Sequence, residues 1–145
     1  MKIEVLFKQC DEIQLERTPQ GVRWLKLKGC LSLLENISHL RALHGQDPSL
    51  WPLPVGGGHV EMLLRELILK NQCAWEFPYQ HAEVCHCRNV SLRKVDDSIL
   101  LGAHQPEVVS QLTLASTACG TCRPDVEKII AYRLNRNPET MKKVG

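Results

Sequence analysis

Residues 119–126 read Cys119-Gly120-Thr121-Cys122-Arg123-Pro124-Asp125-Val126, so a pair of cysteines is followed at once by the signals that open a helix. Proline is favoured in the first turn of a helix, where its missing N–H costs nothing, and an acidic residue there interacts well with the helix dipole. Apolar residues then recur at helical spacing, as Val126, Ile129, Ile130 and Leu134. The stretch predicts a cysteine-bearing loop that leads directly into the last helix of the chain.

A second cysteine pair, Cys85-His86-Cys87, lies upstream, with 31 residues between the two pairs. Ser91 is a good N-cap for a helix that runs to Leu101. Pro106 suits the first turn of a shorter helix that ends near Thr113. The second half of the chain is therefore predicted to be all helix and loop.

The two cysteine pairs indicate an iron-sulfur site. Four thiolates, two for each iron, are the usual ligands of a [2Fe-2S] cluster, and short spacings let each pair hold one side of it. Structural zinc also accepts four thiolates, so zinc is an alternative on the ligands alone. Cations beside the ligands favour thiolate over thiol, and here they are Arg88, Arg93, Lys94 and Arg123. We predict that the cluster ligands are Cys85, Cys87, Cys119 and Cys122.

The residues around both pairs resemble the BFD-like [2Fe-2S] domain, named after bacterioferritin-associated ferredoxin. The resemblance rests on Cys85-His86-Cys87-Arg88-Asn89-Val90, residues 99–103, Glu107-Val108-Val109 and residues 119–126. It implies a helix-turn-helix domain that holds the cluster near its surface, where it is suited to electron transfer. Ser116 and Ala118 stand where that family often carries glycines.

The first half of the chain alternates apolar and polar residues before it turns helical. Residues 2–8, 13–17 and 22–28 show the two-residue period of strands. Apolar residues at helical spacing follow over residues 33–43 and 60–71. We therefore predict an α+β protein, with a small N-terminal antiparallel sheet and two helices followed by an all-helical helix-turn-helix [2Fe-2S] domain.

Changes of pattern along the chain predict two domains. The first covers residues 1–72, and a linker with alternating aromatic residues follows over 73–83. The [2Fe-2S] domain is expected over 84–136, and residues 137–145 are expected to form a flexible tail.

The first domain resembles a shortened IscU-type scaffold, the kind that precedes a BFD-like domain in the nitrogen-fixation scaffold NifU. The resemblance rests on two strands, on Lys26-Leu27-Lys28-Gly29-Cys30 before a helix, and on Leu53-Pro54-Val55 leading to His59. Cys30 and His59 fall at ligand positions of that family, but Val60 replaces a ligand cysteine and the segment with the first ligand cysteine is absent. The resemblance implies a degenerate scaffold domain kept for binding a partner.

Composition and charge exclude several classes of function. A net charge of +2 is small for a nucleic-acid binder, which needs a concentrated basic face. The longest stretch without a charged residue has 15 residues, from Val108 to Cys122, whereas a membrane span needs roughly 20 apolar ones. The first eight residues are interrupted by charge, so we expect no signal peptide and a cytoplasmic protein. Seven cysteines, an odd number, favour metal or redox chemistry over a disulfide framework.

These observations lead to one expected function and one alternative. We expect a BFD-like ferredoxin that passes single electrons to a protein partner, without enzymatic activity of its own. The alternative is a NifU-like assembly or interaction protein whose cluster is structural or is transferred to an iron-sulfur partner. An enzyme with a reactive cysteine has no support, because no cysteine has a convincing base beside it in the sequence.

Overall fold

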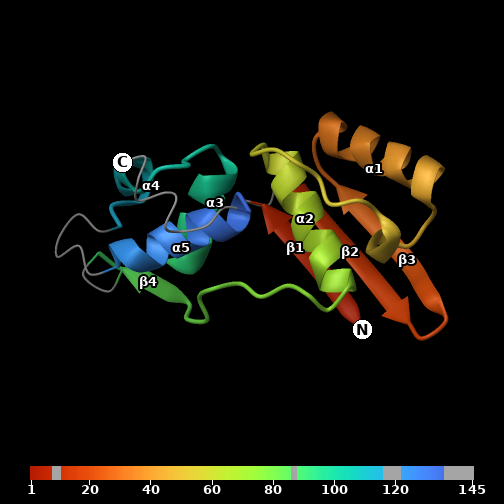
Figure 1. The fold of residues 1–145 in the computed structure, drawn as a ribbon. Helices are drawn as coiled ribbons and strands as arrows, with labels where there is room; N and C mark the ends of the chain where they lie inside the picture. The colour runs from red at the N-terminus through yellow and green to blue at the C-terminus, as the bar shows by residue number, and fades with distance from the viewer. Residues whose placement is uncertain (8–10, 86–87, 116–121, 136–145) are drawn as a thin grey trace. The chain divides into compact units, whose positions relative to one another are not determined.

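The computed structural model describes residues 1–7, 11–85, 88–115 and 122–135 of the 145-residue chain. These residues form two compact units (Figure 1). The N-terminal unit comprises residues 1–56 and 60–75, and the C-terminal unit comprises residues 57–59 and 76–145. Among the described residues, no helix is both long enough and apolar enough to cross a membrane.

The N-terminal unit is built on an antiparallel sheet of three strands, β1 (Lys2–Phe7), β2 (Asp11–Thr18) and β3 (Gly21–Lys28), in the order β1-β2-β3. Ile3 pairs with Leu15 and Val5 with Ile13, which places these apolar side chains on one face. A register shift between Glu16 and Arg17 interrupts the pairing of β2 with β3. The predicted strands are confirmed, and β2 begins and ends slightly beyond the expected residues.

Helices α1 (Leu31–His44) and α2 (His59–Asn71) follow the sheet, with the short 3-10 helix η1 (Pro48–Leu50) between them. Figure 1 shows α2 lying along one face of the sheet. Helix α1 ends as predicted at Gly45, whose φ of 89° is in the region that glycine adopts most readily and whose N–H donates to the Arg41 carbonyl. Both units have an apolar interior, and the fully buried large side chains of the N-terminal one are Val5, Ile13, Leu15, Leu33, Ile37, Met62, Leu63, Leu67 and Ile68.

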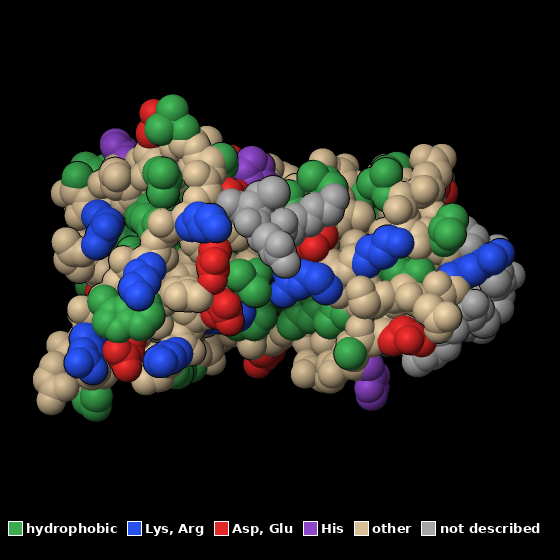
Figure 2. Space-filling model, turned by 180° about the vertical axis from the view of Figure 1, so that it is seen from behind, with side chains coloured by type: hydrophobic (Ala, Val, Ile, Leu, Met, Phe, Trp, Pro, Cys, Tyr) green, Lys and Arg blue, Asp and Glu red, His purple; other side chains and the backbone are tan. Residues whose placement is uncertain are grey.

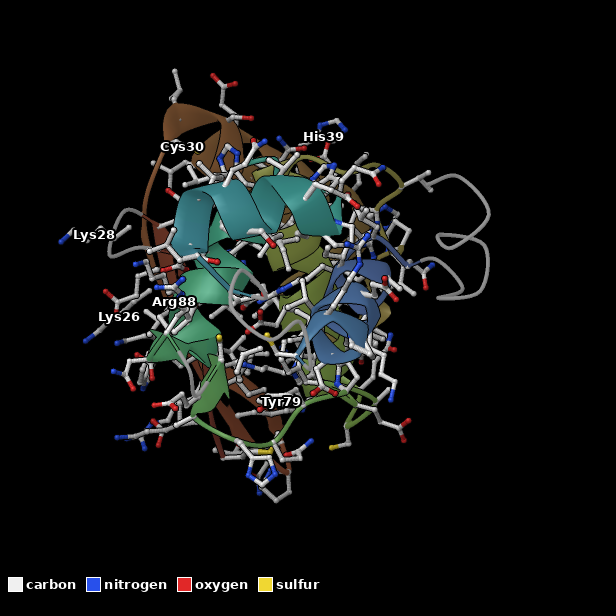
Figure 3. The ribbon with its side chains drawn as sticks, turned by 90° about the vertical axis from the view of Figure 1, so that its left-hand side faces the viewer. Lys26, Lys28, Cys30, His39, Tyr79 and Arg88 are labelled. Atoms are coloured by element: carbon white, nitrogen blue, oxygen red, sulfur yellow. The ribbon has the colours of Figure 1, made fainter. Side chains whose placement is uncertain are left out.

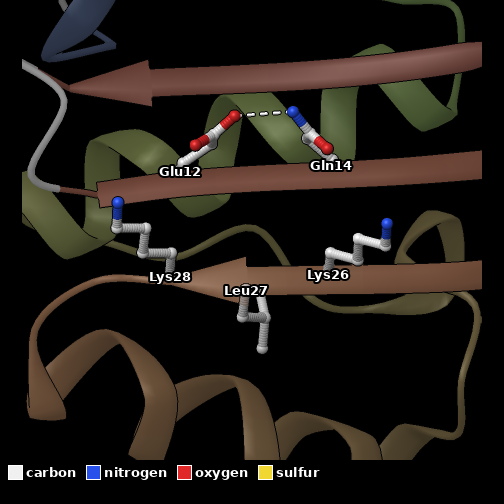
Figure 4. A pocket seen from close by; sticks show the side chains of 5 residues that line it. All are labelled: Glu12, Gln14, Lys26, Leu27 and Lys28. Atoms are coloured by element: carbon white, nitrogen blue, oxygen red, sulfur yellow. Dashed lines mark hydrogen bonds between the residues drawn. The ribbon is translucent and has the colours of Figure 1, made fainter.

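The opposite face of the sheet is polar and forms a shallow hollow (Figure 4). Glu12 and Gln14 of β2 stand across from Lys28 and Lys26 of β3, and Gln14 Nε2 donates to Glu12 Oε1 at 2.6 Å. Exposed lysines on an edge strand such as β3 discourage pairing with another chain. We therefore attribute the lysines of this hollow to the need to keep the exposed edge of the sheet soluble.

A bidentate ion pair ties the loop after α1 to the sheet. Arg17 donates to both carboxylate oxygens of Asp47, at 2.6 and 2.9 Å, and also to Asn71 Oδ1 at 3.3 Å. The hydrogen bond from Arg17 is the largest influence that lowers the pKa of Asp47, to about 2. A carboxyl group whose pKa is lower in the folded state stabilises the fold above its unfolded pKa, and this contribution is lost as the pH falls through the folded pKa.

Asp47→Asn should therefore lower the free energy of unfolding by about 1 kcal/mol at pH 7, as expected for a partly exposed pair. The deficit should shrink as the pH falls from about 4 towards 2, because Asp47 of the wild-type protein then becomes protonated. Urea unfolding at several pH values measures both effects. Glu35→Gln on the exposed side of α1 is the matched control. A deficit that persists unchanged at low pH would show that the carboxylate charge is not what matters.

The C-terminal unit contains a two-stranded hairpin and three helices. The hairpin pairs β4 (Glu83–Cys85) with β5 (Val90–Ser91), and the helices are α3 (Leu92–Leu100), α4 (Pro106–Thr113) and α5 (Arg123–Arg133). Ser91 caps α3 as predicted, since its hydroxyl accepts from the Lys94 N–H at 3.1 Å. The α+β class is confirmed, but the expectation of a purely helical second half is wrong at this hairpin. Asn89 has a positive φ of 53°, which allows the tight turn between the strands.

A buried ion pair joins the first and last helices of this unit. Arg133 of α5 donates to both oxygens of Asp96 of α3, at 2.7 and 2.5 Å. The side chain of Arg133 is 3% exposed and that of Asp96 is 9% exposed. Charges buried to this degree are tolerated only when they are paired and hydrogen-bonded. The pair therefore fixes how α3 and α5 lie against each other.

Candidate functional site

Cys85, the first predicted cluster ligand, is the last residue of β4 and is 2% exposed. The ladder that carries it is short, with Glu83 opposite Ser91, Cys85 opposite Val90 and an irregularity between the two pairs. The N–H of Leu92 extends the pairing by donating to the Ala82 carbonyl at 2.7 Å. The strand that carries Cys85 therefore makes few backbone hydrogen bonds with its partner strand.

Cys122, the fourth predicted ligand, is the N-cap of α5 and is 6% exposed. Its carbonyl accepts from the Val126 N–H at 3.1 Å, so the helix begins directly behind the thiol. The first N–H groups of a helix have no partner within it, and the positive end of the helix dipole stabilises a thiolate. The sequence prediction that the last helix starts directly after Cys122 is confirmed.

Arg123, the residue after Cys122, bridges α4 and α5. Its guanidinium is paired with Glu107 of α4 and, at 3.3 Å, with Glu127 of α5. The hydrogen bond to Glu107 is the main cause that raises the pKa of Arg123, and the Glu107 backbone N–H and Arg123 hold the pKa of Glu107 below its ordinary value. The cation predicted beside the cluster is therefore partly neutralised by two carboxylates.

Tyr79 connects the surroundings of the two ligands. Its hydroxyl donates to the Glu83 carbonyl at 2.6 Å, two residues before Cys85. Burial raises the pKa of Tyr79, and the negative charges of Asp125, Cys122 and Glu83 raise it further. Figure 1 shows the end of β4, where Cys85 lies, and the start of α5, where Cys122 lies, at the same end of the C-terminal unit.

Residues 83–132 match the family model of the BFD-like [2Fe-2S] binding domain. This BFD-like domain begins at the first residue of β4, ends one residue before the C-terminus of α5, and includes all four predicted ligands. The match covers 50 of the 145 residues and classifies this segment alone. The curated proteins and the solved structures gave no match to the chain.

The residues of the BFD-like domain fit a [2Fe-2S] cluster. Two thiols from different parts of the chain are buried, and one of them lies at a helix start, where an anionic sulfur is favoured. Cys87 and Cys119, the other two predicted ligands, lie outside the described residues. The complete ligand set of four cysteines therefore remains a prediction.

Charged side chains around the BFD-like domain are mixed in sign. Arg88 is exposed on the hairpin (Figure 3), and Arg93 of α3 pairs with Asp97 at 3.5 Å. Figure 2 shows Lys and Arg side chains interleaved with Asp and Glu over the face in view. On that face, the described residues present no continuous basic surface of the kind that nucleic acids need.

A separate group of possible ligands involves Cys30, the N-cap residue of α1. The Cys30 N–H donates to Asp11 Oδ1 at 2.8 Å, and Cys30 Sγ lies 3.7 Å from Asp11 Oδ2. Any side chain at Gly29 would begin 2.5 Å from Asp11 Oδ1, so glycine is required for this approach. The sequence singled out Cys30 but missed Asp11.

Proposed function

We propose that the protein holds a [2Fe-2S] cluster through Cys85, Cys87, Cys119 and Cys122 and passes single electrons to a protein partner, without catalysing a reaction of its own. The match of residues 83–132 to the BFD-like [2Fe-2S] binding domain, with Cys85 and Cys122 both buried within it, carries this proposal. A [2Fe-2S] cluster supplies a centre whose potential depends on hydrogen bonds, charge and exposure to solvent. The chain supplies two buried thiols and, at Cys122, the helix start that favours the anionic form of that thiol.

The surroundings of Cys122 also suit a small, rigid electron carrier. The ligand lies at the start of α5, and Arg123 links this start to α4 through Glu107. Arg133 at the other end of α5 is locked to Asp96 of α3. A site supported by packed helices changes shape little when its charge changes, which favours electron transfer.

Anaerobic purification followed by iron, sulfide and zinc analysis tests the proposal. We expect about two irons and two acid-labile sulfides per chain and a visible absorbance that one electron per cluster bleaches. Reoxidation should restore the spectrum with the iron retained. Iron without sulfide, or zinc alone, would reject the cluster. Loss of iron during each reduction would reject the electron carrier.

A second function, in iron-sulfur assembly, is favoured by Asp11 and Cys30 in the N-terminal unit. A carboxylate and a thiol 3.7 Å apart can take part in binding a metal ion, and soft thiolate ligands suit iron or zinc. The same purified protein distinguishes the two functions when it is mixed with an apo-protein that accepts a [2Fe-2S] cluster. Transfer that is lost in Cys30→Ser would favour assembly, whereas a cluster that stays on this chain would favour electron transfer.

A further inference from the structure

The segment just before the matched domain, residues 76–81, carries Phe77, Tyr79 and His81, and we call it the aromatic segment. The sequence predicts it as part of a linker. In the structure it belongs to the C-terminal unit, together with the BFD-like domain. The described side chains show what holds it there.

The beginning of the aromatic segment is attached to α5. The Glu76 N–H donates to the Tyr132 hydroxyl at 2.6 Å, and the rings of Phe77 and Tyr132 meet edge to face with their centroids 6.0 Å apart. The guanidinium of Arg133 lies 5.8 Å from the centroid of the Phe77 ring. Such aromatic and cation-π contacts are each worth on the order of 1 kcal/mol. The segment therefore has a defined place on the last helix.

The end of the aromatic segment is attached to β4, the strand that ends in Cys85. Tyr79 donates from its hydroxyl to the Glu83 carbonyl at 2.6 Å, and its ring meets that of His81 at 5.6 Å between centroids. Figure 3 shows Tyr79 beside the hairpin strand that leads to Cys85. Because β4 pairs with β5 at only a few residues, a bond to Glu83 from outside the ladder is a large part of its support.

We propose that Tyr79 is a positioning residue for the cluster: its hydroxyl holds β4 and thereby sets where Cys85 presents its sulfur. The proposal rests on the proposed function, since it requires Cys85 to be a cluster ligand. The proposal adds to the cluster site a residue outside the matched domain, because Tyr79 lies four positions before residue 83. The aromatic segment then links α5, whose N-cap is Cys122, to the strand that ends in Cys85.

Tyr79→Phe tests this proposal because it removes the hydroxyl and keeps the ring. The full-length variant is loaded with its cluster, and the measurements are the rate at which an iron chelator removes the cluster and the visible circular dichroism of the loaded protein. We expect removal several-fold faster than in the wild type and an altered dichroism spectrum, since the sulfur of Cys85 is less well held.

Tyr132→Phe is the matched control, because it removes the other tyrosine hydroxyl that binds this segment, at the end far from Cys85. It should leave the dichroism spectrum unchanged and the rate of removal close to that of the wild type. Equal effects of both variants would show that Tyr79 contributes only to the general stability of the unit, which would overturn its positioning role. No effect of Tyr79→Phe on either measurement would overturn that role as well. A wild-type protein that holds no iron and sulfide would overturn the proposed function itself.

Discussion

Cys122→Ser is expected to lower the bound iron and acid-labile sulfide to less than about a tenth of the wild-type amount and to abolish the visible absorbance. Cys122 is buried at the start of α5, and we predict that its thiolate binds the cluster. Serine is a good N-cap residue, so the helix itself loses nothing by the change. Any loss can therefore be assigned to the missing sulfur. Element analysis and absorbance on anaerobically prepared protein measure the effect.

Cys73→Ser is the control for this experiment. Cys73 is an exposed cysteine of the N-terminal unit, just after α2, and its replacement should leave iron, sulfide and absorbance unchanged. A Cys122→Ser protein that keeps the wild-type spectrum would remove Cys122 from the ligand set. Equal losses in both variants would point to a general sensitivity of the chain to cysteine replacement.

Arg133→Met is expected to destabilise the C-terminal unit by about 3–5 kcal/mol, because it leaves the carboxylate of Asp96 buried without its partner. Urea unfolding followed by far-ultraviolet circular dichroism measures this loss. All three tryptophans, Trp24, Trp51 and Trp75, belong to the N-terminal unit, so their fluorescence reports on the other unit in the same sample. The fluorescence midpoint should change little.

The double variant Asp96→Leu/Arg133→Met is the matched control. It replaces both charges by apolar side chains and should recover most of the lost stability, because an apolar pair of similar size can substitute for a buried ion pair. A double variant as unstable as Arg133→Met alone would show that the packing of the arginine matters more than its charge. A shared shift of the fluorescence midpoint would show that the two units unfold together.

Much of the helical frame could be predicted because its signals are local. Pro106 and Pro124 mark the first turns of α4 and α5, Ser91 caps α3, and Gly45 ends α1. Each of these residues acts on the backbone within a few positions of itself. The same holds for the alternating residues of β1 and β2, whose apolar side chains identify the buried face.

The hairpin and the role of Tyr79 could not be predicted in the same way. Strands β4 and β5 are only three and two residues long, too short for a period to be recognised, although Asn89, with its positive φ, directly precedes β5. The aromatic segment that carries Tyr79 is held by Tyr132, which lies 56 positions after Glu76. Asp11 and Cys30 meet across 19 positions for the same reason. Contacts of this kind follow from the fold and leave no pattern in the sequence.

The short ladder between β4 and β5 has a consequence for the life of the protein in a cell. A two-stranded hairpin with so few hydrogen bonds is barely stable by itself, and its turn carries the exposed Arg88. If the chain loses its iron, we expect the pairing of β4 with β5 to open, and the exposed Arg88 beside it is a residue after which trypsin-like proteases cut. Empty copies would then be degraded sooner than loaded ones, so turnover itself would select for the iron-bearing form.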